Sequence, residues 1–164
     1  SSPISIITGG PGSGKTTLIQ SLIKELSANF FIGYAKHDAH YFEMDHPGKD
    51  TYVARESGAK NVFISNKDQY AFIGQGHLEN HVKRILFQQC NFVLVEGHKK
   101  TDIPKIIMID NEMKIIELIK QNELTNILAL CGESSSHKLP DDLPFFHRND
   151  IPSIGKFILD KLKV

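Results

Sequence analysis

The feature that most constrains this chain is a glycine-rich segment between a short apolar run and an amphipathic one. The apolar residues 4–8 predict a buried strand, and apolar residues at helical spacing from Leu18 to Leu26 predict a helix over residues 15–28. The segment between them fits the pattern GxxxxGK[ST] of a phosphate-binding loop, or P-loop. Its residues are Gly9, Gly10, Pro11, Gly12, Ser13, Gly14, Lys15 and Thr16, with Thr17 directly after them.

A strand, a glycine-rich turn and a helix in this order are the setting in which such a loop binds a chain of phosphates. Glycines let the backbone wrap closely around phosphate oxygens, and the helix N-terminus adds a partial positive charge. We therefore expect Lys15 to reach the β- and γ-phosphates and the Thr16 hydroxyl to ligate Mg²⁺. The alternative is a glycine-rich turn that binds no ligand.

A carboxylate candidate follows the continuous apolar strand predicted over residues 92–95. Glu96 ends this run, and Gly97 allows the backbone to turn sharply after it. Mg²⁺ bound to phosphates usually needs a carboxylate at the carboxyl end of a neighbouring strand, the Walker-B position. We predict that Glu96 ligates Mg²⁺, contacts it through water or polarises a water. The alternative is a strand-end acid that faces solvent.

The remaining pattern predicts strands that alternate with amphipathic helices. Further strands are expected over residues 30–36, 61–65, 69–73, 105–109 and 126–130, and further helices ending near residue 57, over 77–89, over 112–120 and at the C-terminus. Asp150 is expected to cap the last helix, and the helix over 77–89 is expected to bury Leu78, Val82, Ile85 and Leu86.

This alternation indicates the α/β class, with strands that are apolar throughout because helices cover both faces of the sheet. We expect the three-layer P-loop NTPase fold, in which a mostly parallel sheet has helices on both faces, with a hairpin extension. The whole of residues 1–164 is expected to form a single P-loop nucleotide-binding domain.

The charge balance argues against a protein that binds nucleic acid. The chain has 19 Lys plus Arg against 19 Asp plus Glu, whereas affinity for a phosphate backbone needs excess cations, so we expect no nucleic-acid partner. No apolar run approaches the roughly 18 residues of a membrane span, and two cysteines are too few for a disulfide framework, so a cytoplasmic protein without a membrane partner is expected.

Nothing in the sequence marks Arg55, Arg84 or Arg148 as an arginine finger. This favours slow hydrolysis or transfer of phosphate.

Histidines gather in the polar stretch over residues 37–48, which is predicted to be a loop. His37, His40 and His46 lie there with Asp38 and Asp45. A loop after the second strand reaches the carboxyl edge of the sheet, where α/β proteins bind ligands. A solvated loop is the alternative.

Two other patterns are predicted to be structural. His77 and His81 are four residues apart on a predicted helix but lack the Glu of the zinc-protease pattern, so no metal site is expected there. Asn66-Lys67-Asp68 differs from the guanine-reading sequence Asn-Lys-x-Asp because its aspartate stands one position too early. We predict that it forms the turn between two strands.

Five further segments accompany the P-loop in an order and spacing typical of one group of proteins. They are Lys36-His37-Asp38-Ala39-His40, Asp45-His46-Pro47-Gly48-Lys49-Asp50-Thr51, Arg55-Glu56-Ser57-Gly58-Ala59, Val95-Glu96-Gly97-His98-Lys99 and Pro104-Lys105-Ile106. Over nearly its whole length the chain resembles the molybdopterin-guanine dinucleotide biosynthesis protein B (MobB) family. The P-loop alone is shared by a vast superfamily, whereas the combination with the Lys-His, Pro-Gly-Lys-Asp and Val-Glu-Gly segments is specific to this group.

The resemblance implies a GTP-binding protein with Mg²⁺, weak GTPase activity and usually a homodimeric state. It implies an adaptor to the guanylyltransferase that joins GMP to molybdopterin, making the guanine dinucleotide form of the molybdenum cofactor. Molybdopterin itself or molybdoenzyme assembly factors are further candidate partners. By position, Lys15 and Glu96 would be catalytic, and Thr16, Glu96 and Asp38 would hold the metal. The nucleotide site or its flank would comprise Gly9 to Thr17 with Lys36, His37, His40, Asp45, Gly48, Lys49, Asp50, Gly97 and Lys99.

Two positions depart from the family pattern. His98 stands where the family usually has Phe, and Cys131-Gly132-Glu133 follows the last inner strand, where a small residue and an Asp are expected. If that Asp helps to read the base, the resemblance does not secure a preference for guanine.

Two other functions stay open at this point. A P-loop small-molecule kinase would close an Arg-lined lid over the transferred phosphoryl group, and no Arg-rich segment is visible between residues 91 and 139. A pure interaction module would bind nucleotide for stability alone.

Overall fold

The computed structural model describes residues 2–37, 40–109, 114–133 and 139–164. The chain groups into two compact units. The larger unit comprises Ser1–His37 and Arg84–Val164, and the smaller unit is Asp38–Lys83. The P-loop and the strand that ends at Glu96 both belong to the larger unit.

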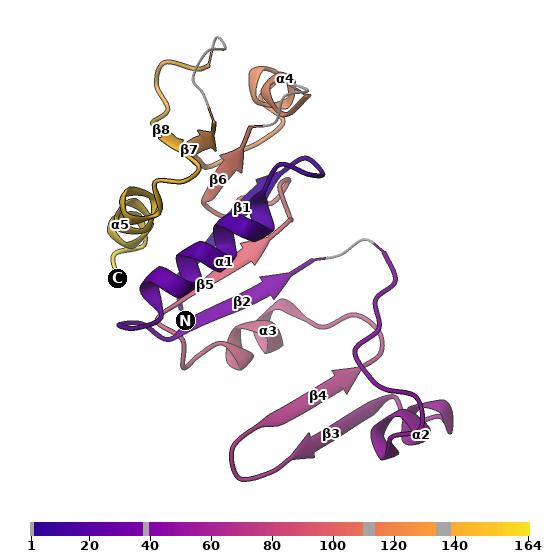
Figure 1. Ribbon diagram of the computed structural model, residues 1–164. Coiled ribbons are helices and arrows are strands. Elements are labelled where there is room, and N and C mark those ends of the chain that lie inside the picture. Colours follow the sequence, from indigo (N-terminus) through magenta and orange to yellow (C-terminus); the bar gives the residue numbers. More distant parts are fainter. Residues whose placement is uncertain (1, 38–39, 110–113, 134–138) are drawn as a thin grey trace. The chain divides into compact units, whose positions relative to one another are not determined.

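A six-stranded sheet forms the centre of the larger unit (Figure 1). Its strands are β1 (Ile4–Gly9), β2 (Ile32–Lys36), β5 (Phe92–Glu96), β6 (Lys105–Met108), β7 (Ile127–Gly132) and β8 (Phe145–His147). They follow the spatial order β2-β5-β1-β6-β7-β8, and neighbouring strands pair in parallel throughout. Parallel pairing brings all the carboxyl ends to one edge, where α/β sheets bind ligands. The predicted α/β class with a mostly parallel sheet is confirmed.

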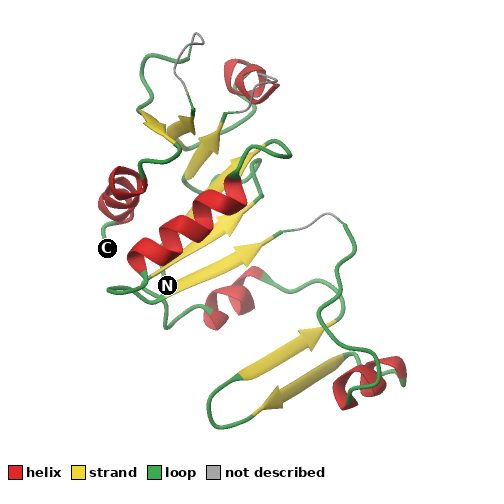
Figure 2. Ribbon diagram, viewed as in Figure 1, coloured by secondary structure: helices red, strands yellow, loops and turns green. Residues whose placement is uncertain are grey.

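Helices and apolar clusters lie on both faces of this sheet (Figure 2). The helices of the chain are α1 (Lys15–Leu26), α2 (Asp50–Glu56), α3 (Asn80–Leu86), α4 (Lys114–Lys120) and α5 (Ile151–Leu162). Ile7 and Ile106 pack in the cluster that contains α1 and α5, whereas their neighbours Ile6 and Ile107 pack in the other clusters. Successive residues of a strand point to opposite faces, so continuous apolar strands fill cores on both sides.

A buried lysine ties together the opposite, amino-terminal edge of the sheet. Lys105 is the first residue of β6, and its Nζ donates hydrogen bonds to the carbonyl oxygens of Thr101 and Thr125. Burial holds the pKa of Lys105 below its usual value, although the charge of Asp102 acts in the other direction. These bonds join the segments that lead into β6 and β7.

The smaller unit contains α2 and an antiparallel hairpin of β3 (Asn61–Ser65) and β4 (Tyr70–Gly74). Asn66 Oδ1 accepts hydrogen bonds from the backbone N–H groups of Asp68 and Gln69, both over 2.9 Å. The asparagine side chain therefore closes the turn. The predictions of a hairpin and of a turn at Asn66 are confirmed.

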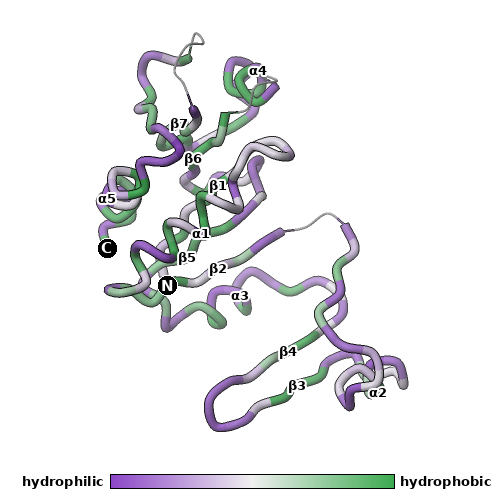
Figure 3. The backbone as a smooth tube through the Cα atoms, in the orientation of Figure 1, coloured by the Kyte–Doolittle hydropathy of each residue, from purple (hydrophilic) through white to green (hydrophobic). Residues whose placement is uncertain are grey.

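One face of this hairpin is aromatic and exposed. Phe63 pairs with Phe72 across the strands, and Tyr70 lies on the same face because it is two residues from Phe72. The three side chains are 63 %, 52 % and 71 % exposed in the order Phe63, Phe72 and Tyr70. Figure 3 shows hydrophobic stretches along both strands.

The region around α3 differs from the prediction. The helix begins at Asn80, so His77 precedes it and does not share a helix face with His81. No residue of α3 is buried, and Ile85 and Leu86 are more than half exposed, so the predicted buried face is wrong. Apolar spacing defines a stripe on a helix but does not say whether another element covers it.

The other elements lie close to their predicted ranges. Asp150 caps α5 as predicted, since its side chain accepts a hydrogen bond from the Ser153 N–H over 3.3 Å. No predicted element corresponds to β8, because its three residues are too few to show a strand pattern. None of the described helices has the length and apolar character that a membrane crossing requires.

We expect Leu22→Ala and Leu86→Ala to differ in their effects on stability. Leu22 is fully buried between α1 and the sheet, so its truncation should lower the free energy of unfolding by about 2–5 kcal/mol. The same truncation at Leu86, which is 53 % exposed, should cost about 0.5 kcal/mol or less. Denaturant unfolding of both variants measures the difference, and equal losses would show that α3 is buried after all.

Candidate nucleotide-binding site

The P-loop lies between β1 and α1, at the edge where the strands end. Gly12 and Gly14 have left-handed φ angles of 71° and 89°, which glycine adopts without strain. A Cβ at Gly9 would lie 2.5 Å from Ser13 Oγ and 2.9 Å from Met108 Cβ, whereas one at Gly12 would meet no atom within 4 Å. The loop is therefore packed tightly against the sheet at Gly9 and open at Gly12.

Two polar groups of the loop fit an anionic ligand. Ser13 Oγ is buried and has no hydrogen-bond partner among the described residues, although buried hydroxyls normally have one. Lys15 Nζ lies 3.5 Å from Gly9 O and 3.4 Å from Gly10 O, longer than the roughly 3.2 Å limit of well-formed N–H···O bonds. The ammonium group can exchange these weak contacts for charge-assisted bonds to phosphate.

Glu96 is the buried carboxylate beside this loop. It ends β5, where Ile7 of β1 and Lys36 of β2 are its register neighbours. Thr16 Oγ1 donates a hydrogen bond to Glu96 Oε1 over 2.5 Å, and the Tyr34 hydroxyl donates one to Oε2 over 2.6 Å. Glu96 is 2 % exposed, so the alternative of a solvent-facing acid is excluded.

The surroundings of Glu96 favour its ionised form. Burial alone would raise the pKa of Glu96, but the hydrogen bonds from Thr16 and Tyr34 and the charges of Lys36 and Lys15 hold it below its usual value. Burial of the Tyr34 phenol, with its hydrogen bond to Glu96 and the charge of that carboxylate, raises the pKa of Tyr34 to about 12. At neutral pH Tyr34 is a donor and Glu96 a carboxylate, the form that ligates Mg²⁺.

The segments that follow β2 and β5 place three more predicted residues near Glu96. Lys36 is its register neighbour, the His37 N–H donates to the Glu96 carbonyl oxygen over 3.1 Å, and Gly97 turns the backbone with a φ of 96°. The rings of His37 and His98 stack, with centroids 4.1 Å apart and planes 26° apart. Position 98, where a Phe was expected from the family pattern, thus keeps a planar ring.

Other predicted binding residues lie in the smaller unit. Gly48 has a φ of 82°, Lys49 is the N-cap of α2, and Asp50 is the first residue of that helix. His40 belongs to the loop before them. Asp38, predicted to hold the metal, lies outside the described residues. Lys99 is in the larger unit, in the turn after β5.

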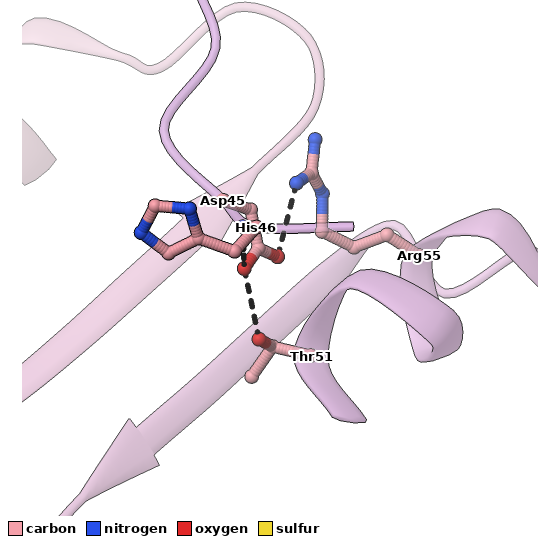
Figure 4. Close-up of polar contacts among 4 residues, drawn as sticks. All are labelled: Asp45, His46, Thr51 and Arg55. Carbon is pink, nitrogen blue, oxygen red and sulfur yellow. Dashed lines mark hydrogen bonds and ion pairs between the residues drawn. The ribbon is translucent and has the colours of Figure 1, made fainter. Parts of the chain in front are cut away.

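Asp45 has protein partners for both of its carboxylate oxygens (Figure 4). It accepts hydrogen bonds from the His46 N–H over 2.9 Å, Thr51 Oγ1 over 3.1 Å and Arg55 Nη1 over 3.2 Å. Burial would raise the pKa of Asp45, but the bonds from Arg55, His46 and Thr51 lower it. The bonds from Thr51 and Arg55 join the loop to α2. A role of Asp45 in binding the nucleotide stays a prediction.

Arg148 lies at the P-loop although the sequence does not single it out. A Cβ at Gly14 would overlap its guanidinium group, lying 2.9 Å from Cζ. Nη1 pairs with Glu133 Oε1 over 3.4 Å, and the Arg148 N–H donates to the Gly132 carbonyl oxygen over 2.8 Å. Arg148 follows β8, so only recognition of that strand could have placed it at this edge.

The family model described as molybdopterin guanine dinucleotide synthesis protein B (MobB) matches residues 4–133. The chain belongs to the MobB family. Two similar proteins are named molybdopterin-guanine dinucleotide biosynthesis adapter protein. That of Haemophilus influenzae is 33 % identical over 165 residues, covering 95 % of this chain and 87 % of the relative. That of Escherichia coli is 26 % identical, covering 96 % and 92 %.

Solved structures agree with this family assignment at the level of the fold. The crystal structure of Bacillus subtilis MobB has a TM-score of 0.77 at 24 % identity, covering 97 % of both chains. A MobB homologue from Bacillus stearothermophilus has a TM-score of 0.71 at 19 % identity, covering 98 % of this chain and 97 % of the other. The hydrogenase maturation factor HypB from Archaeoglobus fulgidus has a TM-score of 0.55 at 16 % identity, covering 98 % and 90 %. The expected P-loop NTPase fold is confirmed.

We expect Glu96→Gln to change how stability depends on pH. A carboxyl group whose pKa is lower in the folded state stabilises the fold above its unfolded pKa, and this contribution is lost as the pH falls through the folded-state pKa. Below about pH 4.3, the usual pKa of Glu, the free energy of unfolding should therefore fall more steeply in the wild type than in the variant. Denaturant unfolding between pH 7 and pH 3 measures both profiles, and equal slopes would contradict the lowered pKa.

Proposed function

We propose that this protein is a nucleotide-dependent adaptor in the synthesis of the guanine dinucleotide form of the molybdenum cofactor. Its family membership and the two relatives named adapter proteins support this role. The observation that carries nucleotide binding is the 2.5 Å contact of Thr16 with Glu96, beside a loop whose buried Ser13 hydroxyl has no partner among the described residues.

The nucleotide that we propose is GTP with Mg²⁺. The backbone of the loop and Lys15 would bind the β- and γ-phosphates, and Thr16 and Glu96 would hold the metal, whose charge would neutralise the phosphates when bound. Among the residues that the structure describes, no three or more His, Cys, Asp or Glu side chains gather as a metal centre. Mg²⁺ at a nucleotide needs only one or two carboxylates besides waters and phosphates, so Thr16 and Glu96 suit it.

Hydrolysis at this site is proposed to be slow. Lys15 would stabilise charge on the transferred phosphoryl group, and Glu96, oriented by Tyr34, would hold the metal or position water. An arginine finger adds about 10³- to 10⁵-fold to such a rate. Arg148, the arginine at the loop, is engaged by Glu133 instead.

Protein partners follow from an adaptor role, and we propose the cofactor guanylyltransferase and a second copy of this chain. The exposed aromatic face of the hairpin supports self-association, since a two-stranded sheet is marginally stable when its apolar face is uncovered. The proposed compartment is the cytoplasm, and the free thiols of Cys90 and Cys131 suit a reducing one.

Substitution of Lys15 tests the proposed nucleotide site. Wild-type protein should gain about 2.7 kcal/mol of stability from GTP and Mg²⁺ at 100 times the dissociation constant. Lys15→Ala should weaken GTP binding by about 10-fold or more, because a charge-assisted contact is lost, while the protein stays folded. Lys24→Ala, on the exposed last turn of the same helix, is the matched control. Thermal unfolding and calorimetry measure both effects.

Three outcomes would contradict the proposal. They are equal GTP affinity in Lys15→Ala and wild type, several turnovers per second by the purified protein, and transfer of phosphate from ATP to a nucleotide, pterin or sugar acceptor. Unchanged support of cofactor synthesis by Lys15→Ala would favour an interaction module instead.

A charge on the aromatic face of the hairpin tests the proposed homodimer. Phe72→Asp should convert the dimer into a monomer, because a carboxylate would have to be desolvated at an apolar interface. Phe31→Asp places the same charge on a side chain of the larger unit that is 78 % exposed, and should leave the dimer intact. Sedimentation velocity measures the mass of each variant. A monomeric wild type, or a dimer that survives Phe72→Asp, would contradict this assignment.

A further inference from the structure

Tyr34 lies on β2, the strand at one border of the six-stranded sheet. Its register neighbour on β5 is Leu94, whereas Lys36, two residues later, is the neighbour of Glu96. Residues two apart on a strand point to the same face, so the side chains of Tyr34 and Glu96 share one face, with Tyr34 roughly 7 Å behind along the strand direction. The length of the phenol lets its hydroxyl donate to Glu96 Oε2 over 2.6 Å.

The surroundings of the two partners differ. Tyr34 is 42 % exposed, whereas Glu96 is 2 % exposed. The tyrosine therefore has much of its surface in solvent while its hydroxyl reaches a buried carboxylate. A phenylalanine would cover the same part of the sheet, so what distinguishes tyrosine at this position is its hydrogen bond to Glu96.

This hydrogen bond leaves Glu96 with one oxygen on each side of the site. Oε1 accepts from Thr16 Oγ1, the hydroxyl proposed to ligate the metal, and Oε2 accepts from Tyr34. While Tyr34 holds Oε2, the carboxylate can turn one oxygen toward a cation beside Thr16, but not both.

Mg²⁺ and Ca²⁺ differ in what they require of a carboxylate. Mg²⁺ is the smaller ion, keeps near-ideal octahedral geometry and usually retains several waters, so one oxygen of an acid is enough for it. Ca²⁺ takes about 6–8 oxygen ligands at longer distances and often binds both oxygens of one carboxylate. The number of available ligands and the rigidity of a site therefore decide between the two ions.

We propose that Tyr34 is a positioning residue that makes the site select Mg²⁺ over Ca²⁺, because it keeps one oxygen of Glu96 away from the metal. This role rests on the proposed function, since it requires a nucleotide-bound metal at Thr16 and Glu96. Tyr34 itself does not touch the metal and acts through Glu96, whose carboxylate it fixes between two protein donors.

Tyr34→Phe tests this role, because it removes the hydroxyl and keeps the ring. Wild-type protein should bind GTP about 10-fold or more tightly with Mg²⁺ than with Ca²⁺, and the variant should reduce this ratio to about 3-fold or less, since Oε2 can then contact the larger ion. Tyr41→Phe makes the same change on a side chain that is 86 % exposed and should keep the wild-type ratio. Calorimetry with each ion measures the affinities. A general loosening of the site would weaken GTP binding with both ions, leave the ratio unchanged and contradict the proposal.

A second substitution shows whether Tyr34 acts through Glu96. An amide has a single oxygen and cannot bind a cation through two, so Tyr34→Phe should not alter the ratio of the two affinities when Glu96→Gln is already present. Independent effects of the two substitutions on this ratio would show that Tyr34 acts by another route.

Tyrosine fluorescence tests the hydrogen bond without any ligand. The chain has 4 Tyr and no Trp, so no tryptophan emission masks the tyrosines. A carboxylate that accepts a hydrogen bond from a phenol quenches its emission. Glu96→Gln should therefore raise the emission of the wild-type protein but not that of Tyr34→Phe, and equal rises in both would contradict the contact.

The outcomes separate this inference from the proposed function. If Lys15→Ala weakens GTP binding but Tyr34→Phe keeps the wild-type ratio of affinities, Tyr34 does not select the metal and the P-loop site stands. If the wild-type protein binds GTP equally well with Mg²⁺ and Ca²⁺, the selection by Tyr34 is overturned even without a variant. If GTP binds with neither ion, both this inference and the proposed function are overturned.

Discussion

The hydrogen-bonded carboxylate of Glu96 is the contact on which the site depends. A buried charge is costly unless it is paired and hydrogen-bonded, and Glu96 meets this requirement with Thr16 on one oxygen and Tyr34 on the other. The two donors come from the first turn of α1 and from β2, the strand that pairs with β5. The same bonds that keep the carboxylate ionised therefore hold the start of α1 against the sheet and aim the acid at the P-loop.

Parallel strand order turns distant parts of the chain into neighbours at this contact. The P-loop follows β1, Glu96 ends β5, Glu133 follows β7 and Arg148 follows β8, so each reaches the same edge because each strand ends there. The opposite edge has a different construction, in which Lys105 binds the carbonyl oxygens of Thr101 and Thr125. At the amino-terminal edge of the sheet, hydrogen bonds within the protein join the segments that lead into β6 and β7. At the carboxyl edge, the buried Ser13 hydroxyl lacks a partner among the described residues.

The sequence predicts best what is local to one segment. The P-loop, the strand that ends at Glu96 and the Asn66 turn each carry their own pattern of residue types, and the structure has all three. Tyr34 could not be predicted, because its bond to Glu96 depends on the register between β2 and β5. Arg148 was missed because the three-residue β8 has no periodicity. The exposed Leu86 shows the converse error, since an apolar stripe does not reveal what covers it.

The brevity of β8 also affects how the sheet meets other molecules. It is an outermost strand, and such strands offer unpaired backbone groups on which other chains can add as further strands. Three residues from Phe145 to His147 give a template too short for stable addition, so this border is protected from aggregation. Because β8 ends at His147, the chain turns at once into Arg148 and α5. The short strand that protects the edge of the sheet therefore also places the Arg148 guanidinium at the P-loop.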